Sequence, residues 1–224
     1  MIDLSNIQRS YRVGDETVHA LRGVSLNIQA GEYVSIMGPS GSGKSSLLNI
    51  LGLLDRPNAG HYQLDNRDVT GLSDDELAKV RREKIGFVFQ FFHLVPRLTA
   101  AENIALPMVL AGIEPAERQK RLSTLLAQYG LENRAGHRPD QLSGGQCQRV
   151  AIARAMSMQP PVILADEPTG NLDRHTGQDV IALLEGLHAA GGTLVMVTHD
   201  VELGGRAKRR LRMVDGQLVS DDRS

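Results

Sequence analysis

The chain has 224 residues, 41% of them hydrophobic and 23% charged, which is enough for a complete core in one α/β domain, with or without an inserted subdomain. Its 25 Lys and Arg residues nearly balance its 26 Asp and Glu residues, so the overall charge gives no reason to expect a nucleic-acid partner. A single cysteine, an N-terminus unlike a signal peptide, and the lack of any membrane-length apolar run predict a cytosolic protein that reaches membranes only through a partner.

The first thirty residues alternate between apolar and polar side chains, with a turn expected at Gly14-Asp15. This period of two predicts short antiparallel strands. They lead into an apolar strand at Tyr33–Met37, which is followed by a helix-like stretch from Ser46 to Leu54.

Further β-like runs lie at residues 84–90, 162–165 and 193–198, and the last two are almost wholly apolar. Such runs after helical segments are typical of buried parallel strands. Between residues 91 and 159 the periodicity becomes helical, for example from Ala116 to Tyr129. The sequence therefore predicts an α/β core of residues 1–90 and 160–224, with a helical subdomain at residues 91–159 set into it.

A glycine-rich loop separates the strand at Tyr33–Met37 from the following helix. It reads Gly38, Pro39, Ser40, Gly41, Ser42, Gly43, Lys44 and Ser45, and Ser46 comes next. This spacing matches a loop whose N–H groups surround nucleotide phosphates, while Lys44 reaches the terminal phosphates and the Ser45 hydroxyl binds Mg²⁺. The alternative is an ordinary glycine-rich turn, which the strand before and the helix after disfavour.

Two adjacent carboxylates, Asp166 and Glu167, follow the apolar strand at residues 162–165. Ligands of open α/β sheets bind at the carboxyl ends of such strands. We expect Asp166 to hold Mg²⁺, directly or through water, and Glu167 to polarise a water in line with the γ-phosphate. Two solvated acids at a strand end are the alternative, and the phosphate loop earlier in the chain argues against it.

A third motif, Leu142-Ser143-Gly144-Gly145-Gln146, precedes an alanine-rich helical stretch. Two glycines let a backbone approach phosphate closely, Ser143 adds a hydroxyl donor, and the start of a helix attracts anions. A Gly-Gly turn that only caps a helix remains the alternative for this pentapeptide taken alone.

With these motifs the chain resembles, over nearly its whole length, the ATP-binding subunit of an ABC transporter. The resemblance implies a P-loop NTPase core with a mainly parallel sheet, an N-terminal antiparallel part and an inserted helical subdomain. Besides the Walker A, Walker B and signature motifs, it implies a Q-loop glutamine, a D-loop aspartate, a switch histidine and an adenine-stacking aromatic. These correspond here to Gln90, Asp173, His199 and Tyr11, with Gln90 also expected at the metal.

Residues 89–96, 98–103 and 165–173 resemble the lipoprotein-release and macrolide-export branch, which is LolD/MacB-like. In this family the signature of one subunit completes the nucleotide site of the other. The resemblance thus implies a two-fold dimer that encloses two ATP·Mg²⁺, serves a separate membrane permease and lies at the cytoplasmic face of the inner membrane. The alternative is a regulatory ATPase like FtsE, which signals through a membrane partner to cell-wall enzymes and transports nothing.

Some side chains permit a structural interpretation as well. Tyr11 and His199 could be buried core residues, although their positions favour contacts with adenine and the γ-phosphate, and Cys147 is expected to be a packing residue. The apolar segment of residues 91–98 predicts a docking groove for a helix of the permease beside Phe92, Leu94 and Leu98. Packing within the helical subdomain is the alternative for this segment.

Overall fold

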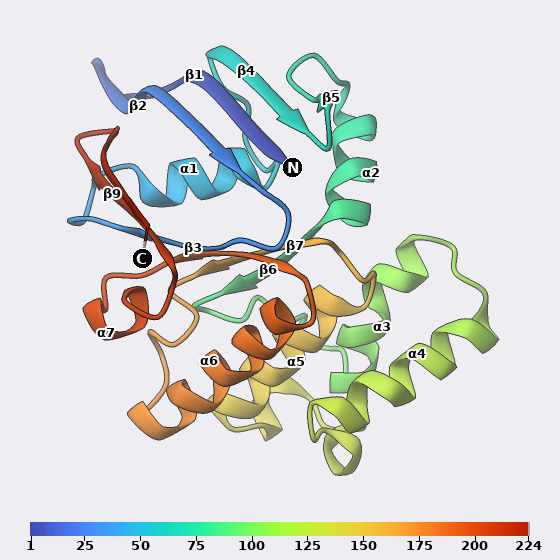
Figure 1. Ribbon diagram of the computed structural model, residues 1–224. Coiled ribbons are helices and arrows are strands. Elements are labelled where there is room, and N and C mark those ends of the chain that lie inside the picture. Colours follow the sequence, from blue (N-terminus) through green and yellow to red (C-terminus); the bar gives the residue numbers. More distant parts are fainter. Residues whose placement is uncertain (224) are drawn as a thin grey trace.

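The computed structural model describes residues 1–223, and two sheets organise them (Figure 1). The smaller sheet is antiparallel with the order β2-β1-β4-β5, formed by β1 (Ile2–Val13), β2 (Glu16–Ile28), β4 (Ala59–Leu64) and β5 (Arg67–Asp68). The turn at Gly14 is confirmed, with φ of 64°. The first two strands are longer than expected, because register shifts near Ile7 interrupt the alternation without ending the pairing.

The larger sheet has the order β10-β9-β3-β8-β7-β6. Its strands are β3 (Tyr33–Met37), β6 (Ile85–Phe89), β7 (Val162–Asp166), β8 (Thr193–Val197), β9 (Arg209–Val214) and β10 (Gln217–Arg223). All neighbours are parallel except β10, which pairs with β9 in the antiparallel sense. The predicted buried parallel strands are confirmed, and the carboxyl ends of β3, β7 and β8 share one edge.

Helices cover both faces of the larger sheet (Figure 1). Helix α1 (Lys44–Leu51) lies between it and the antiparallel sheet, where one apolar core joins all three. Helices α5 (Gly144–Met156) and α6 (Arg174–Ala189) cover the opposite face and share a second core with it. The short helix α7 (Val201–Gly204) follows β8.

The region predicted to be helical contains α3 (Ala100–Leu110), α4 (Pro115–Gln128), two 3₁₀ turns (Glu132–Arg134 and Pro139–Gln141) and α5. Helix α5 also packs directly on β6 of the larger sheet. A Cβ on Gly86 of β6 would lie 2.8 Å from the Ala155 carbonyl oxygen of α5. Glycine at this position therefore permits the close approach of helix and strand.

Helix α2 (Asp74–Lys84) was not predicted from the sequence. Only Leu77 and Val80 of this helix are buried, so the sequence shows no clear helical spacing of apolar residues here. Its start is fixed instead by a capping box, in which Ser73 and Glu76 bond each other's backbone N–H groups. No helix within residues 1–223 has the length and apolarity to cross a membrane.

Candidate active site

The glycine-rich loop joins β3 to α1 in the predicted strand–loop–helix context. Its backbone is one that only glycine adopts readily, since φ is 152° at Gly38 and 98° at Gly43. A Cβ on Gly38 would lie 2.1 Å from the Met213 carbonyl oxygen, and one on Gly43 would lie 2.3 Å from that of Ala20. The loop is therefore wedged between β9 and β2, which fixes its shape.

A cavity of about 420 Å³ opens beside this loop. The predicted site residues that line it are Gly38, Ser40, Gly41, Gly43, Lys44, Ser45, Ser46, Asp166, Glu167 and His199. Val197 of β8 and three residues of β2, namely Val18, His19 and Ala20, complete the wall. Sequence reasoning missed these four residues, because their apolar and alternating patterns indicate only strands.

The Lys44 ammonium lies over the loop, where its Nζ donates to the carbonyl oxygens of Gly38 at 2.9 Å and Pro39 at 2.8 Å. The Ser42 hydroxyl is buried and has no hydrogen-bond partner among the described residues. Glycine N–H groups, a helix start and a lysine cation together form a surface suited to phosphate. The cavity thus suits the phosphates of a nucleoside triphosphate.

Asp166 and Ser45 form the part of the cavity that suits a cation. A hydrogen bond joins their side chains, and burial, followed by the charge of Glu167, raises the pKa of Asp166. A hydroxyl and a carboxylate are the hard oxygen ligands that Mg²⁺ accepts while keeping several waters. The two residues therefore fit the predicted Mg²⁺ site.

Glu167 occupies a strained position at the end of β7, with φ of 44°. Such a conformation is costly for a residue with a side chain and marks functional sites. Its N–H donates to the Val197 carbonyl oxygen on β8, and its carboxylate lies 2.9 Å from His199 Nδ1. The strain thus aims the carboxylate into the cavity beside the imidazole, where it can orient a water.

Gln90 does not line the cavity in this structure. Its Nε2 donates to Asn171 Oδ1 at 3.3 Å, and Asn171 Nδ2 donates back to the Gln90 carbonyl oxygen at 3.0 Å. Gly170 is needed for this approach, because a Cβ there would lie 2.6 Å from Gln90 Nε2. The expected contact of Gln90 with the metal therefore stays a prediction that requires this amide pair to open.

The signature residues lie apart from the cavity. Ser143 caps α5 by accepting the Gln146 N–H, and Gln146 Oε1 accepts the Ser143 N–H. Gly145 allows α5 to pack closely on α6, because a Cβ there would lie 2.3 Å from the Thr176 methyl group. Ser143 and Gly144 are exposed, so this helix start is free to meet a ligand from outside the chain.

Asp173 and Tyr11 also lie elsewhere. Asp173 caps α6 by accepting the Thr176 N–H at 3.0 Å. The Tyr11 hydroxyl donates to Asp55 at 2.8 Å, and the Arg9 guanidinium lies 4.5 Å from the centre of its ring. Tyr11 does not line the cavity, but it pairs across β1 and β2 with Val18, which does. Its stacking on adenine stays a prediction.

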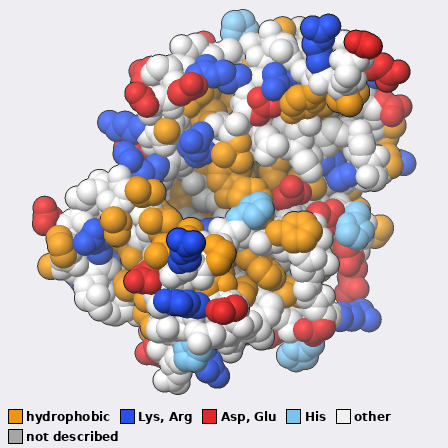
Figure 2. All heavy atoms as spheres, turned by 180° about the vertical axis from the view of Figure 1, so that it is seen from behind, with side chains coloured by type: hydrophobic (Ala, Val, Ile, Leu, Met, Phe, Trp, Pro, Cys, Tyr) orange, Lys and Arg blue, Asp and Glu red, His pale blue; other side chains and the backbone are white. Residues whose placement is uncertain are grey.

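In the segment after Gln90, the side chains predicted for docking, Phe92, Leu94 and Leu98, are half-buried, and two other apolar side chains are more exposed. Phe91 is 69% exposed and Val95 is 37% exposed, whereas Leu94 packs against the second core. On the face opposite to that of Figure 1, hydrophobic side chains gather in a hollow across the middle of the molecule (Figure 2). The docking groove beside Phe92, Leu94 and Leu98 stays a prediction, and Phe91 and Val95 are the more exposed apolar side chains of the segment.

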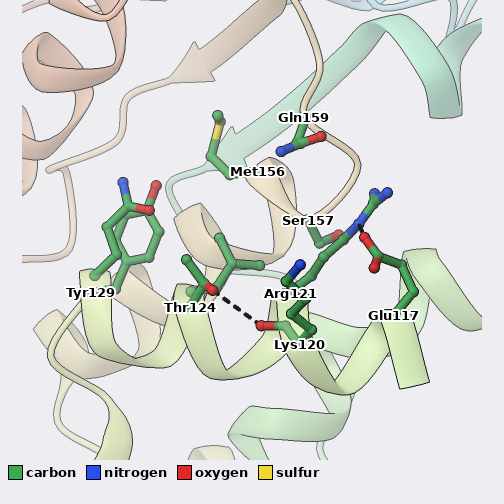
Figure 3. A pocket seen from close by; sticks show the side chains of 10 residues that line it. Glu117, Lys120, Arg121, Thr124, Tyr129, Met156, Ser157 and Gln159 are labelled. Carbon is green, nitrogen blue, oxygen red and sulfur yellow. Dashed lines mark hydrogen bonds and ion pairs between the residues drawn. The ribbon is translucent and has the colours of Figure 1, made fainter. Parts of the chain in front are cut away.

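A second cavity, of about 340 Å³, lies between α4 and the end of α5 (Figure 3). Apolar and polar side chains line it, including Leu125, Tyr129 and Met156, and an ion pair joins Glu117 to Arg121 at its edge. None of the predicted site residues lies there. The cavity has no glycine loop, and Glu117 places a carboxylate in the first turn of α4 at its wall, so the phosphate chemistry belongs to the first cavity.

Comparison with known proteins agrees with this assignment. A family model described as ABC transporter matches residues 21–170. The pyoverdine export ATP-binding/permease protein PvdT of Pseudomonas fluorescens (strain Pf0-1) is 53% identical over 222 residues, which are 99% of this chain but 34% of PvdT. The chain thus spans about a third of that relative.

Other relatives match over their whole length. The uncharacterized ABC transporter ATP-binding protein YvrO of Bacillus subtilis (strain 168) is 50% identical, with 100% of this chain and 97% of YvrO covered. A dimeric post-hydrolysis structure of the ATP-binding cassette MJ0796, bound to ADP and Pi, superposes with a TM-score of 0.92 and 48% identity, covering 100% of this chain and 98% of that one. With its phosphate loop, paired carboxylates and signature helix, the chain belongs to the ABC transporter family and is an ATP-binding ATPase domain of that family.

Proposed function

We propose that this chain binds and hydrolyses ATP as a two-fold dimer and drives a separate membrane permease for export or for lipoprotein release. The observation that carries the proposal is the separation of two phosphate-binding helix starts. The start of α1 opens into the cavity with Asp166 and Glu167, whereas Ser143 at the start of α5 is exposed outside it. A second copy, related by a two-fold axis, can bring its Ser143 to that cavity, and by symmetry the Ser143 of the first copy reaches the cavity of the second.

Within each site, the residues have distinct roles. The loop and Lys44 bind the triphosphate, and Ser45 with Asp166 holds Mg²⁺, which supplies charge neutralisation for phosphoryl transfer. Glu167 orients the attacking water and takes its proton, while His199 contacts the γ-phosphate. Loss of phosphate removes the ligand that joins the two chains, so they separate.

Relatives support the link to a membrane partner. PvdT is named as an export ATP-binding/permease protein and carries additional length beyond the part that matches this chain. The exposed Phe91 and Val95 offer an apolar contact for a permease at the cytoplasmic face of the inner membrane.

Affinity purification in mild detergent tests this function. We expect one integral membrane protein to co-purify with two copies of this chain, and we expect the double variant Phe91→Ser and Val95→Ser to recover much less of it. A chain that hydrolyses ATP but co-purifies with no membrane protein would contradict the transport role. Recovery of a membrane protein bound to cell-wall enzymes would favour the regulatory alternative.

A further inference from the structure

Arg154, near the end of α5, fastens that helix to the segment that follows Gln90. Its Nη1 donates to the His93 carbonyl oxygen at 2.6 Å, and its Nη2 donates to the Phe92 carbonyl oxygen at 2.9 Å. Among residues 1–223 no carboxylate pairs with this guanidinium. The cation is thus held by two backbone carbonyls alone.

Both sides of this contact cost free energy: the guanidinium is buried, and the backbone that accepts its hydrogen bonds is strained. Burial lowers the pKa of Arg154, as expected for a cation that is removed from water without a counter-charge. Phe92 and His93 have φ of 59° and 47°, a left-handed conformation that side chains disfavour. Two unfavourable features meet in one pair of hydrogen bonds, and such strain is typical of functional positions.

Further contacts join α5 to the same region. Gln148 is fully buried, and its Nε2 donates to the Phe89 carbonyl oxygen at 3.3 Å and to the Pro168 carbonyl oxygen at 2.8 Å. At the start of α5, the Phe92 ring lies 3.9 Å from where a Cβ on Gly144 would be. The helix that bears Ser143 therefore contacts both the end of β6 and the segment beyond it.

We infer that Arg154 is a positioning residue that makes residues 91–98 move with the signature helix. Hydrogen-bond networks and rigid helices carry coupling between distant sites. Closure of the dimer on ATP acts on the Ser143 end of α5, and Arg154 passes the displacement to the surface that bears Phe91 and Val95. This inference rests on the proposed dimer function and specifies how its motion reaches the partner surface.

The test places an environment-sensitive fluorophore on Val95→Cys, in a chain that also carries Cys147→Ser and Glu167→Gln to retain ATP. Arg154→Met keeps an unbranched apolar stem but removes the hydrogen-bond donors. Arg154→Lys keeps a charged donor, and Arg149→Met removes an arginine from the same helix as a control. ATP-dependent dimerisation is measured in parallel by light scattering.

Addition of ATP and Mg²⁺ should change the fluorescence with Arg154 intact. In Arg154→Met the response should fall about tenfold while the dimer still forms, because two hydrogen bonds to a charged donor are lost. Arg154→Lys should restore most of the response, and Arg149→Met should leave it intact. If Arg154→Met does not fold, Arg154→Gln, which retains donors for a single carbonyl, should give an intermediate response.

A full response in Arg154→Met, or in Arg154→Gln where that variant replaces it, overturns the inference and leaves the proposed function standing. Loss of the response in Arg149→Met as well would assign the effect to the helix as a whole and also overturns it. If ATP produces no dimer with Arg154 intact, the proposed function fails, and this inference fails with it.

Discussion

The two glycines at Gly41 and Gly43 provide a matched test of how the phosphate loop is held. Both have a left-handed backbone, with φ of 79° and 98°. A Cβ on Gly41 would meet nothing within 4 Å, whereas one on Gly43 would lie 2.3 Å from the Ala20 carbonyl oxygen. Gly41→Ala and Gly43→Ala therefore share the conformational penalty, and only Gly43→Ala adds a clash with β2.

The expected magnitudes follow from this difference. A left-handed alanine costs about 1–2 kcal/mol, and the lower entropy of the unfolded alanine chain offsets about 0.4–1 kcal/mol in both variants. At Gly43 the neighbouring backbone must also move by more than about 1 Å to reach a normal contact. Such overpacking costs about 1–3 kcal/mol, so Gly43→Ala should lose that much more free energy of unfolding than Gly41→Ala.

Urea unfolding without nucleotide measures both variants against the parent chain, and unchanged slopes would validate the comparison. The larger loss in Gly43→Ala should be accompanied by weaker binding of a fluorescent ATP analogue, because Ala20 lines the same cavity. Equal loss of stability in the two variants would refute the conclusion that the contact between the loop and β2 fixes the loop.

Four further variants test individual roles. Glu167→Gln should abolish turnover yet retain ATP and accumulate dimer in gel filtration; near-parental hydrolysis would contradict its role. Burial, followed by the charge of Glu167, raises the pKa of Asp166 above its unfolded value, so the folded chain loses stability as pH rises through that window. Asp166→Asn should thus raise the unfolding temperature of the nucleotide-free chain at neutral pH, with the gain vanishing below the ordinary aspartate pKa. Phe91→Ser with Val95→Ser should strongly reduce recovery of the membrane partner, whereas Leu94→Ser should instead lower stability; the reverse pattern would favour docking beside Phe92, Leu94 and Leu98.

Much of the nucleotide site could be predicted from the sequence, because its residues are local motifs at strand ends. Parallel strands bring their carboxyl ends to one edge, so Ser45 and Asp166 had to lie close together once β3 and β7 joined one sheet. The same rule explains why Glu167 and His199, at the ends of β7 and β8, are neighbours.

What could not be predicted depends on contacts between segments without a motif. The cavity wall from β2 follows from the packing of the antiparallel sheet on the loop, and alternation cannot reveal it. Gln90 pairs with Asn171, and Arg154 donates to the His93 carbonyl oxygen; in each case the two residues are more than sixty positions apart in the sequence. Exposure along residues 91–98 depends on how the left-handed Phe92 and His93 turn the chain, and apolar composition alone does not give that direction.

Mixed dimers test the shared nucleotide site most directly. Lys44 and Ser143 act in the same site from different chains in this account, so Lys44→Ala and Ser143→Arg each inactivate both sites of a homodimer. A heterodimer of the two variants holds one doubly damaged site and one intact site, and we predict that mixing the inactive parents restores part of the ATPase activity. A mixture that stays as inactive as its parents, with heterodimers confirmed by mass, would contradict the shared site.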